Sequence, residues 1–307
     1  MNNYIVEHIS HISNKNIIIS GANGYIGKEL ANQLILNEIQ YTGIDKRQRE
    51  DSPHISLNLN DSKSIDLISS LDCDYFIHAG THSALAYQDN FVESFCEDMT
   101  SLRNIFTGLS SNSKCRLIYF SSSYVYSGIP RKEKVNEETT LTPVHNFGLA
   151  KSFFEQMILR NYPNSIIFRL SSVFGGSNSL HPNAITNMAK EVKENKLLTV
   201  WGNGDRQMQY IYIEDVVKFI LHSFILDTGV YNLGADDYNT VLETANQIAK
   251  YFGVEVKNLP EKTEGFTLPF MKNNKLIAAS NIKFSDNQVS NLNTYLDQLN
   301  NSLNNKF

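Results

Sequence analysis

Ser20-Gly21-Ala22-Asn23-Gly24-Tyr25-Ile26-Gly27 follows the apolar run Asn16-Ile17-Ile18-Ile19 and opens a segment in which Ile26, Leu30 and Leu34 recur at helical spacing. A buried run, a cluster of glycines and a helical period in this order predict a strand, a tight turn and a helix.

Such a turn is suited to a phosphate ligand, because a helix N-terminus carries unpaired N–H groups and partial positive charge. Gly21 would make the sharp turn, Gly24 would let the backbone touch a pyrophosphate, and Gly27 would let helix and strand pack closely. Asn23, Tyr25 and Ile26 are assigned to the same cofactor site. The glycines are spaced one residue wider than in the common dinucleotide fingerprint, and a turn without a ligand also uses glycine.

The next predicted strand favours the dinucleotide interpretation. Ile39 to Ile44 ends in Asp45, where a carboxylate can accept hydrogen bonds from the ribose hydroxyls of adenosine. Arg47, with Lys46 and Arg49 beside it, would attract the 2′-phosphate of NADP, whereas Asp45 would repel it. We therefore expect NAD, with NADP as the alternative.

Small residues follow another predicted strand, Asp74 to Ala79, which ends in Gly80. Ala79 and Gly80 would allow a cofactor to lie across the strand end, where ligands bind in open parallel sheets. Leu59, just after a short strand predicted at His54 to Leu57, is assigned to the same site.

Chemistry-bearing side chains follow the strand predicted at Arg116 to Phe120. It runs into Ser121-Ser122-Ser123, whose hydroxyls are expected to face the cofactor cleft. The helix predicted at Asn146 to Asn161 carries Phe147 and Lys151 on one face. Alternation of strands and helices up to Ile166–Leu170 predicts an α/β fold with a doubly wound parallel sheet.

Beyond Gly175-Gly176 the pattern changes, and we expect residues 1–175 to form a nucleotide-binding domain and 176–307 a smaller substrate-binding lobe that threads back to the sheet. Elements of this second part are predicted at Ala184–Asn195, Leu198–Val200, Tyr210–Ile213, Asp215–Leu226, Val230–Leu233 and Thr240–Phe252. Val289, Leu292, Leu296, Leu299 and Leu303 predict a last helix packed on its own domain. A short helix is predicted at the start, over Tyr4 to Ile12.

Composition excludes several classes of protein. The net charge of −5 over 307 residues, with no basic block, argues against a nucleic-acid surface. The first thirteen residues lack an apolar core of signal-peptide length, and the longest apolar stretch, Phe219–Leu226, is interrupted by His222 and Ser223. We expect a soluble cytoplasmic protein with no membrane partner.

The cysteines and the closely spaced histidines do not predict a metal site. Cys73, Cys96 and Cys115 are odd in number and far apart, so we expect core thiols rather than a disulfide framework or a metal pair. His78 and His82 fall at a strand end and its loop, not on one helix face, and no metal is expected.

Taken together, these residues resemble the extended short-chain dehydrogenase/reductase family, in its nucleotide-sugar epimerase, dehydratase and reductase branch, from about Asn16 to Phe284. The likeness implies a Rossmann-type sheet. It rests on the glycine turn, Asp45 and these further segments: Ser121–Gly128, Pro143–Glu155, Arg169–Gly175, Gly202–Asp215 and Val230–Gly234.

In that family a tyrosine exchanges a proton with a sugar oxygen while hydride passes to or from nicotinamide. A lysine four residues later binds the nicotinamide ribose and lowers the tyrosine pKa, and a Ser or Thr hydrogen-bonds the same sugar oxygen. The resemblance assigns these last roles to Lys151 and Ser122, but the tyrosine position is Phe147. Losing a positioned acid or base typically costs about 10²–10⁴ in rate.

Several groups could replace the missing phenol. Tyr124 or Tyr126 could supply one from the facing loop, Ser122 could act through a water, or Lys151 could transfer the proton itself. Either tyrosine could instead be a packed aromatic.

The substrate site implied by the resemblance also departs from the family. Ser172 stands where an Asn usually contacts the substrate diphosphate, and Met208 where an Arg binds phosphate, although Arg206 is near enough to replace it. Ser123 and Tyr124 replace the Asp and Glu of dehydratases, which disfavours water elimination.

The function implied is therefore an NAD(P)-dependent epimerase or 4-keto reductase. It would act by hydride transfer at C4 of a nucleotide-activated sugar and could supply surface polysaccharide synthesis. The alternative is a non-catalytic NAD(P)-binding sensor or partner protein of the same fold. The resemblance also implies a homodimer formed through the helices near Asn90–Leu109 and Asn146–Asn161.

Overall fold

The computed structural model describes residues 12–47, 54–176, 183–285 and 287–304. Most of the helix predicted over Tyr4–Ile12 lies outside these residues, as do Arg49 and the side chain of Leu303.

A seven-stranded sheet in which every neighbouring pair is parallel forms the centre of the molecule. This confirms the predicted α/β class. In spatial order its strands are β12 (Gly229–Leu233), β7 (Ser165–Leu170), β5 (Arg116–Ser122), β4 (Tyr75–His78), β1 (Ile17–Ser20), β2 (Tyr41–Asp45) and β3 (Ile55–Ser56).

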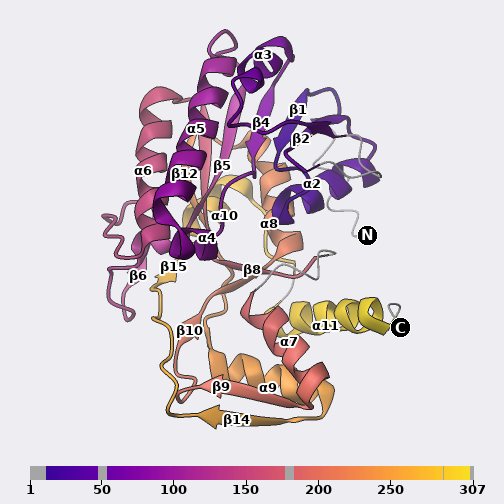
Figure 1. The fold of residues 1–307 in the computed structure, drawn as a ribbon, viewed down its shortest axis with the longest axis vertical. Coiled ribbons are helices and arrows are strands. Elements are labelled where there is room, and N and C mark those ends of the chain that lie inside the picture. Colours follow the sequence, from indigo (N-terminus) through magenta and orange to yellow (C-terminus); the bar gives the residue numbers. More distant parts are fainter. Residues whose placement is uncertain (1–11, 48–53, 177–182, 286, 305–307) are drawn as a thin grey trace.

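Helices cover both faces of the sheet (Figure 1). Alternate residues of β1 show this: Ile17 and Ile19 pack in one core with Leu30 of α2, whereas Ile18 packs in another with Ile105 of α5. The sheet is therefore buried on both sides, as expected for crossovers of parallel strands. The helices around it are α2 (Tyr25–Leu36) and α8 (Ile213–His222) on the first face, and α3 (Lys63–Ser70), α5 (Phe91–Leu109) and α6 (Asn146–Asn161) on the second.

A smaller group of elements lies at the other end of the molecule (Figure 1). The chain reaches it after β8 (Ser172–Phe174), returns through β11 (Tyr210–Tyr212) to add α8 and β12 to the main fold, and then goes back. The group comprises α7 (Ala184–Asn195), β9 (Leu197–Trp201), β10 (Gln207–Met208), β13 (Asn239–Thr240), α9 (Val241–Phe252), β14 (Glu255–Leu259) and α11 (Gln288–Asn304). The expected threading back to the sheet is present, and the boundary at residue 175 stays a prediction.

The last helix packs as its apolar spacing predicts. Leu292, Leu296 and Leu299 of α11 are buried in the same core as α2 and α8, whereas Val289 is exposed. The buried apolar face of α11 is therefore narrower than the spacing of these residues in the sequence indicates.

Several short elements were not predicted, because their periods are too brief to stand out. They include β8, β10, β13 and β14, and also α4 (Ala84–Asp89), a 3₁₀ turn η2 (Ser123–Tyr126), β6 (Lys134–Val135), β15 (Phe270–Met271) and α10 (Asn274–Ser280). The turn η2 matters most, because it carries the segment after Ser122 into the site described below.

The cysteines require a correction. Cys73 and Cys115 are buried, with Sγ atoms 2.7 Å apart at the starts of neighbouring strands, but Cys96 is exposed on α5. The sequence could not show this proximity, because 42 residues separate the pair.

Among the described residues, no helix combines the length and apolar character needed to cross a bilayer.

We expect Gly27→Ala to destabilise the fold by about 1–3 kcal/mol, the usual cost of overpacking a closed core. A Cβ atom at Gly27 would lie 2.2 Å from the carbonyl oxygen of Gly21, so α2 would have to move away from the turn. Denaturant unfolding measures the effect, with Lys28→Ala on the next residue as the control. Equal stability of the two variants would contradict the close contact.

Candidate active site

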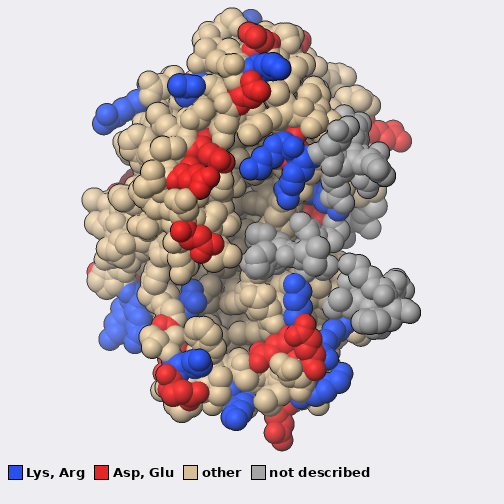
Figure 2. All heavy atoms as spheres, in the orientation of Figure 1, with Lys and Arg blue, Asp and Glu red and all other residues tan. Residues whose placement is uncertain are grey.

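A cavity of about 800 Å³ lies at the carboxyl ends of the central strands and extends to the smaller group of elements. Figure 2 shows the surface hollowed between the two parts, with acidic and basic side chains interspersed around it. Ligands bind at this edge of open parallel sheets. Its lining includes the predicted residues Gly21, Gly24, Tyr25, Ile26, Asp45, Leu59, Ala79, Gly80, Ser122, Tyr124, Phe147, Lys151, Ser172 and Arg206.

The glycine turn leaves the start of α2 open to a ligand. Gly24 is the N-cap residue and has no side chain that could accept from the first-turn amides. A Cβ at Gly24 would lie 2.9 Å from the oxygen of Gly21, so the turn tolerates no larger residue there. An uncapped helix N-terminus facing a cavity fits a dinucleotide pyrophosphate.

Asp45 and Asn23 are held in place by each other. The carboxylate of Asp45 accepts the backbone N–H of Asn23 and that of Arg47, each at 2.9 Å. The side chain of Asn23 donates to the carbonyl of Arg47 and meets the imidazole of His54 at 3.0 Å. Each Asp45 oxygen keeps acceptor capacity for a ribose hydroxyl, whereas the Asn23 side chain serves the turn itself.

Lys151 is fully engaged by the protein. Its ammonium donates to Thr81 Oγ1 at 3.0 Å, to the Tyr119 phenol at 3.1 Å and to the Phe120 carbonyl at 2.9 Å. Burial lowers the pKa of Lys151 to about 8, against the opposing effect of Asp98. The three contacts use all the protons of the charged amine.

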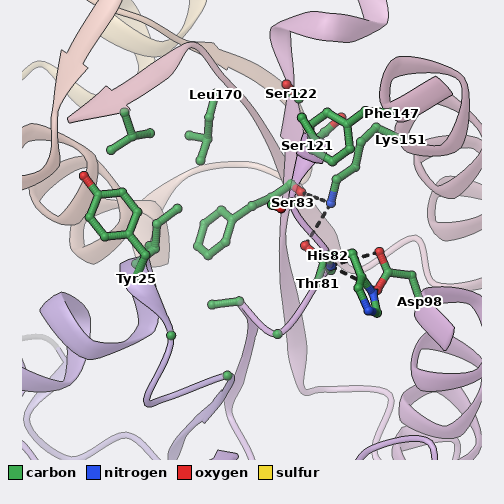
Figure 3. Close-up of a pocket in the computed structure, with 18 of the residues that line it drawn as sticks. Tyr25, Thr81, His82, Ser83, Asp98, Ser121, Ser122, Phe147, Lys151 and Leu170 are labelled. Atoms are coloured by element: carbon green, nitrogen blue, oxygen red, sulfur yellow. Dashed lines mark hydrogen bonds and ion pairs between the residues drawn. The ribbon is translucent and has the colours of Figure 1, made fainter. Parts of the chain in front are cut away.

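Phe147 places an aromatic ring where the resemblance expects a phenol. Its ring lies 5.4 Å from the Lys151 ammonium, 5.5 Å from the ring of Tyr87 and 5.8 Å from that of Tyr124. Figure 3 shows Phe147 beside Lys151, with Thr81 beneath the ammonium and Tyr25 across the cavity. The Lys151 ammonium is thus covered by the ring of Phe147, which packs in turn against the rings of Tyr87 and Tyr124.

Ser121 and Tyr126 both contact a buried ion pair. The Arg169 guanidinium pairs with the Glu155 carboxylate at 2.7 Å and donates to the Tyr126 phenol at 2.6 Å. Ser121 also donates to Glu155. Tyr126 is therefore the packed aromatic that was one of its two interpretations. Ser121, Ser122 and Ser123 all line the cavity, and the Ser121 hydroxyl is bonded to Glu155.

His78 ends β4 and His82 lies in the loop that follows, and sequence reasoning did not identify Asp98 as the partner of His82. His78 is buried, meets Ser20 Oγ at 2.7 Å, and has its pKa lowered to about 4 by burial. His82 instead lies between two carboxylates. Its Nδ1 is 2.7 Å from Asp98 (Figure 3), and its Nε2 is 3.3 Å from Glu97. Nothing in the sequence marks Asp98, which sits in the middle of α5.

Donor groups on the far side of the cavity have no partner among the described residues. They are buried atoms of cavity-lining side chains: Ser171 Oγ, Asn183 Nδ2, Arg206 Nε and the Tyr210 phenol oxygen. The charge of Arg206 acts on the pKa of Tyr210, so the two groups are close. Buried polar atoms are normally hydrogen-bonded, so these groups leave donor capacity beside the cavity for a ligand or an ordered water.

We expect His82 to titrate above the usual histidine range of about 6.5 and His145 below it. The hydrogen bond that His82 donates to Asp98 raises the pKa of His82, whereas burial lowers that of His145. The folded state holds the His82 proton more tightly, so this stabilisation is complete below about 6.5 and is lost as pH rises through the folded-state pKa.

An NMR titration of the ring protons, assigned with His82→Gln, measures both values. A lower pKa for His82 than for His145 would contradict the pairing with Asp98.

A family model described as the NAD dependent epimerase/dehydratase family matches residues 17–234. Two similar proteins are a trifunctional UDP-glucose 4,6-dehydratase/UDP-4-keto-6-deoxy-D-glucose 3,5-epimerase/UDP-4-keto-L-rhamnose-reductase of Arabidopsis thaliana and methionine adenosyltransferase 2 subunit beta of Bos taurus. The first is 25% identical over 85% of this chain and the second 24% identical over 85%. The chain spans 44% of the plant protein and 79% of the bovine one.

Solved structures share the fold at low identity. The UDP-glucose 4-epimerase of Thermotoga maritima, solved with UDP-glucose, has a TM-score of 0.84 at 16% identity, covering 94% of this chain and 99% of that one. The UDP-glucose 4-epimerase of Thermus thermophilus, solved with NAD, has a TM-score of 0.81 at 16% identity, covering 93% and 99%.

NAD, the predicted cofactor, is the one that the family's description names, and the open glycine turn fits it. Because the family model covers well over half of the sequence, including the glycine turn, Lys151 and Arg206, this chain belongs to the NAD dependent epimerase/dehydratase family, the nucleotide-sugar branch of the extended short-chain dehydrogenases/reductases.

Proposed function

We propose that this protein binds NAD and a nucleotide-activated sugar and transfers hydride at C4 of that sugar, as an epimerase or a 4-keto reductase. The observation that carries the proposal is the set of unpartnered buried donors across the cavity from the glycine turn. Guanidinium, amide and hydroxyl donors together match a ligand rich in oxygens, such as a sugar diphosphate.

Arg206 is the cation of this donor set. Its guanidinium takes part in no ion pair within the described ranges, although it lines the cavity, and its Nε is buried. Arg206 is half-buried, and a guanidinium without a counter-ion is suited to bind the oxygens of an anionic ligand. Arg206 would thus replace the family's arginine, whose position is Met208. Ser172, which pairs with Tyr210 between β8 and β11, also lines the cavity.

The opposite half of the cavity would hold NAD. Asp45 would take the adenosine ribose and the start of α2 the pyrophosphate. Ala79 and Gly80 leave room across the end of β4, and the Thr81 hydroxyl, which already accepts from Lys151, lines the cavity at the nicotinamide end. When bound, the nicotinamide supplies the hydride chemistry. Ser122 would hydrogen-bond the reacting sugar oxygen, and Lys151 would hold positive charge beside it.

A second function is favoured by the Lys151 contacts. All three of its donors bind protein acceptors, and Phe147 covers the ammonium, so the usual acid–base pair is absent at this helix. A non-catalytic NAD(P)-binding partner or sensor would need only the cofactor half of the cavity. The similarity to a protein named as a subunit of another enzyme supports this alternative.

The test combines turnover with binding. We expect the purified chain to bind NAD and to convert a nucleotide sugar to its C4 epimer, seen by NMR, or to oxidise NADH with a 4-keto nucleotide sugar. Arg206→Met should raise the KM for the sugar about 10- to 100-fold, because a charge-assisted hydrogen bond contributes about 1.5–3 kcal/mol. NAD affinity should stay unchanged, and Arg160→Met, at an exposed position of α6, is the matched control.

Binding of NAD without turnover of any nucleotide sugar would establish the non-catalytic alternative. Failure to bind NAD would contradict both functions.

We also propose a homodimer that pairs the outer faces of α5 and α6. Val92, Leu149 and Phe153 on these helices are 68, 51 and 47% exposed. Apolar side chains gathered on adjacent helices are typical of a protein interface. The family resemblance points to the same two helices.

We expect Phe153→Glu to dissociate the dimer, because it places a charge within the apolar face. Analytical ultracentrifugation measures the mass. Ile35→Glu is the matched control, since Ile35 is 57% exposed on α2. An unchanged mass for Phe153→Glu would contradict the proposed interface.

A further inference from the structure

We propose that Tyr124 supplies the proton-transferring phenol that Phe147 lacks. The inference rests on the proposed function, because it assigns a catalytic residue to that hydride transfer. It follows from where the other phenols are held, from how the turn η2 is fixed, and from the contact between Tyr124 and Phe147.

Two nearby tyrosines cannot reach the cavity. The Tyr126 phenol is buried and bound to the Arg169 guanidinium at 2.6 Å and to Asn232 at 2.9 Å. The Tyr119 phenol is buried behind Lys151 and accepts its proton at 3.1 Å. Both phenols are committed to the protein interior.

The remaining candidates are on the wrong side or already bonded. Tyr25 donates to the carbonyl of Gly175 at 2.9 Å, and the Tyr87 phenol donates to Asp98 at 2.9 Å. Tyr210 belongs to the donor set beside Arg206, and burial raises its pKa to about 12, which suits a neutral hydrogen-bond donor.

Tyr124 has a phenol oxygen with no hydrogen-bond partner in the described part of the chain, and it lines the cavity together with Ser122. The two are fixed to each other, because Ser122 Oγ accepts the backbone N–H of Tyr124 at 3.3 Å. A hydroxyl and a phenol therefore enter the cavity from one turn.

The turn is pressed against the start of α6. A Cβ atom at Gly148 would lie 2.1 Å from the carbonyl oxygen of Tyr124, so only glycine permits this approach. The Tyr124 ring meets the Phe147 ring edge-on at 5.8 Å and lies 4.7 Å from His145 and 5.7 Å from Phe266. These rings hold Tyr124 next to the position where the helix lacks a phenol.

The proton transfer is balanced. In the reducing direction, hydride from reduced nicotinamide would add to the carbonyl carbon as the C=O π bond breaks, and the Tyr124 O–H would give its proton to the oxygen, leaving a phenolate that regains a proton from water. In the oxidising direction, the phenolate would take the hydroxyl proton as the C=O bond forms and the C–H bond breaks, with hydride passing to oxidised nicotinamide. Ser122 would hold the same oxygen. Lys151 is less suited, because its donors are engaged beneath Phe147.

The experiment compares Tyr124→Phe with the double variant Tyr124→Phe/Phe147→Tyr. The first removes only the phenol oxygen and leaves the ring packing. We expect turnover to fall about 10²–10⁴-fold with unchanged NAD affinity, and the double variant to recover part of it, because its phenol returns on the adjacent ring. Tyr251→Phe is the matched control, since that phenol binds Asp297 on the smaller group of elements.

Turnover of Tyr124→Phe close to the wild-type rate would overturn the assignment while the proposed function stands. A loss of turnover matched by an equal loss of NAD affinity would also overturn it, because the phenol would then act in binding. If the wild-type chain binds NAD but converts no nucleotide sugar, both the assignment and the proposed function fail, whether or not Phe147→Tyr alone creates activity.

Discussion

The close packing around the carbonyl of Gly21 is the constraint on which the cofactor half of the molecule depends. A side chain at Gly27 or Gly24 would collide with that oxygen, and one at Gly21 would lie 2.5 Å from the backbone of Gly80. Backbone atoms cannot move aside as flexible side chains can. The turn therefore brings α2, β1 and the end of β4 together at one edge of the cavity.

A buried ion pair is the corresponding constraint on the part of the site that carries Ser122 and Tyr124. Glu155 of α6 and Arg169 of β7 are joined at 2.7 Å, and Ser121 and Tyr126 bond to the same pair. Removing one partner of such a pair leaves an uncompensated charge, which is strongly destabilising. The pair thus ties α6 to both ends of the segment that carries Ser122 and Tyr124, and it sets where those side chains enter the cavity.

Local sequence patterns were sufficient to predict the main helices and strands. They were not sufficient to identify the group that replaces the phenol missing at Phe147. The helix at Asn146–Asn161 and the parallel sheet could be predicted, because long apolar periods and glycine turns are local signals. The sequence also marked Phe147 as anomalous. It could not show that Tyr126 is bound by Arg169, or that Asp98 holds His82, because those partners are far apart in the chain and meet only through the packing of α5, β5 and β7.

By itself the sequence determined the fold class, the cofactor and the family, since each depends on short runs whose residue types have direct steric or charge consequences. Only the tertiary structure decided which hydroxyls and cations stay available to a ligand. Arg206 and Tyr124 look no different in the sequence from Arg169 and Tyr126. Their availability depends on which buried polar groups find partners, and that is settled when separate elements pack together.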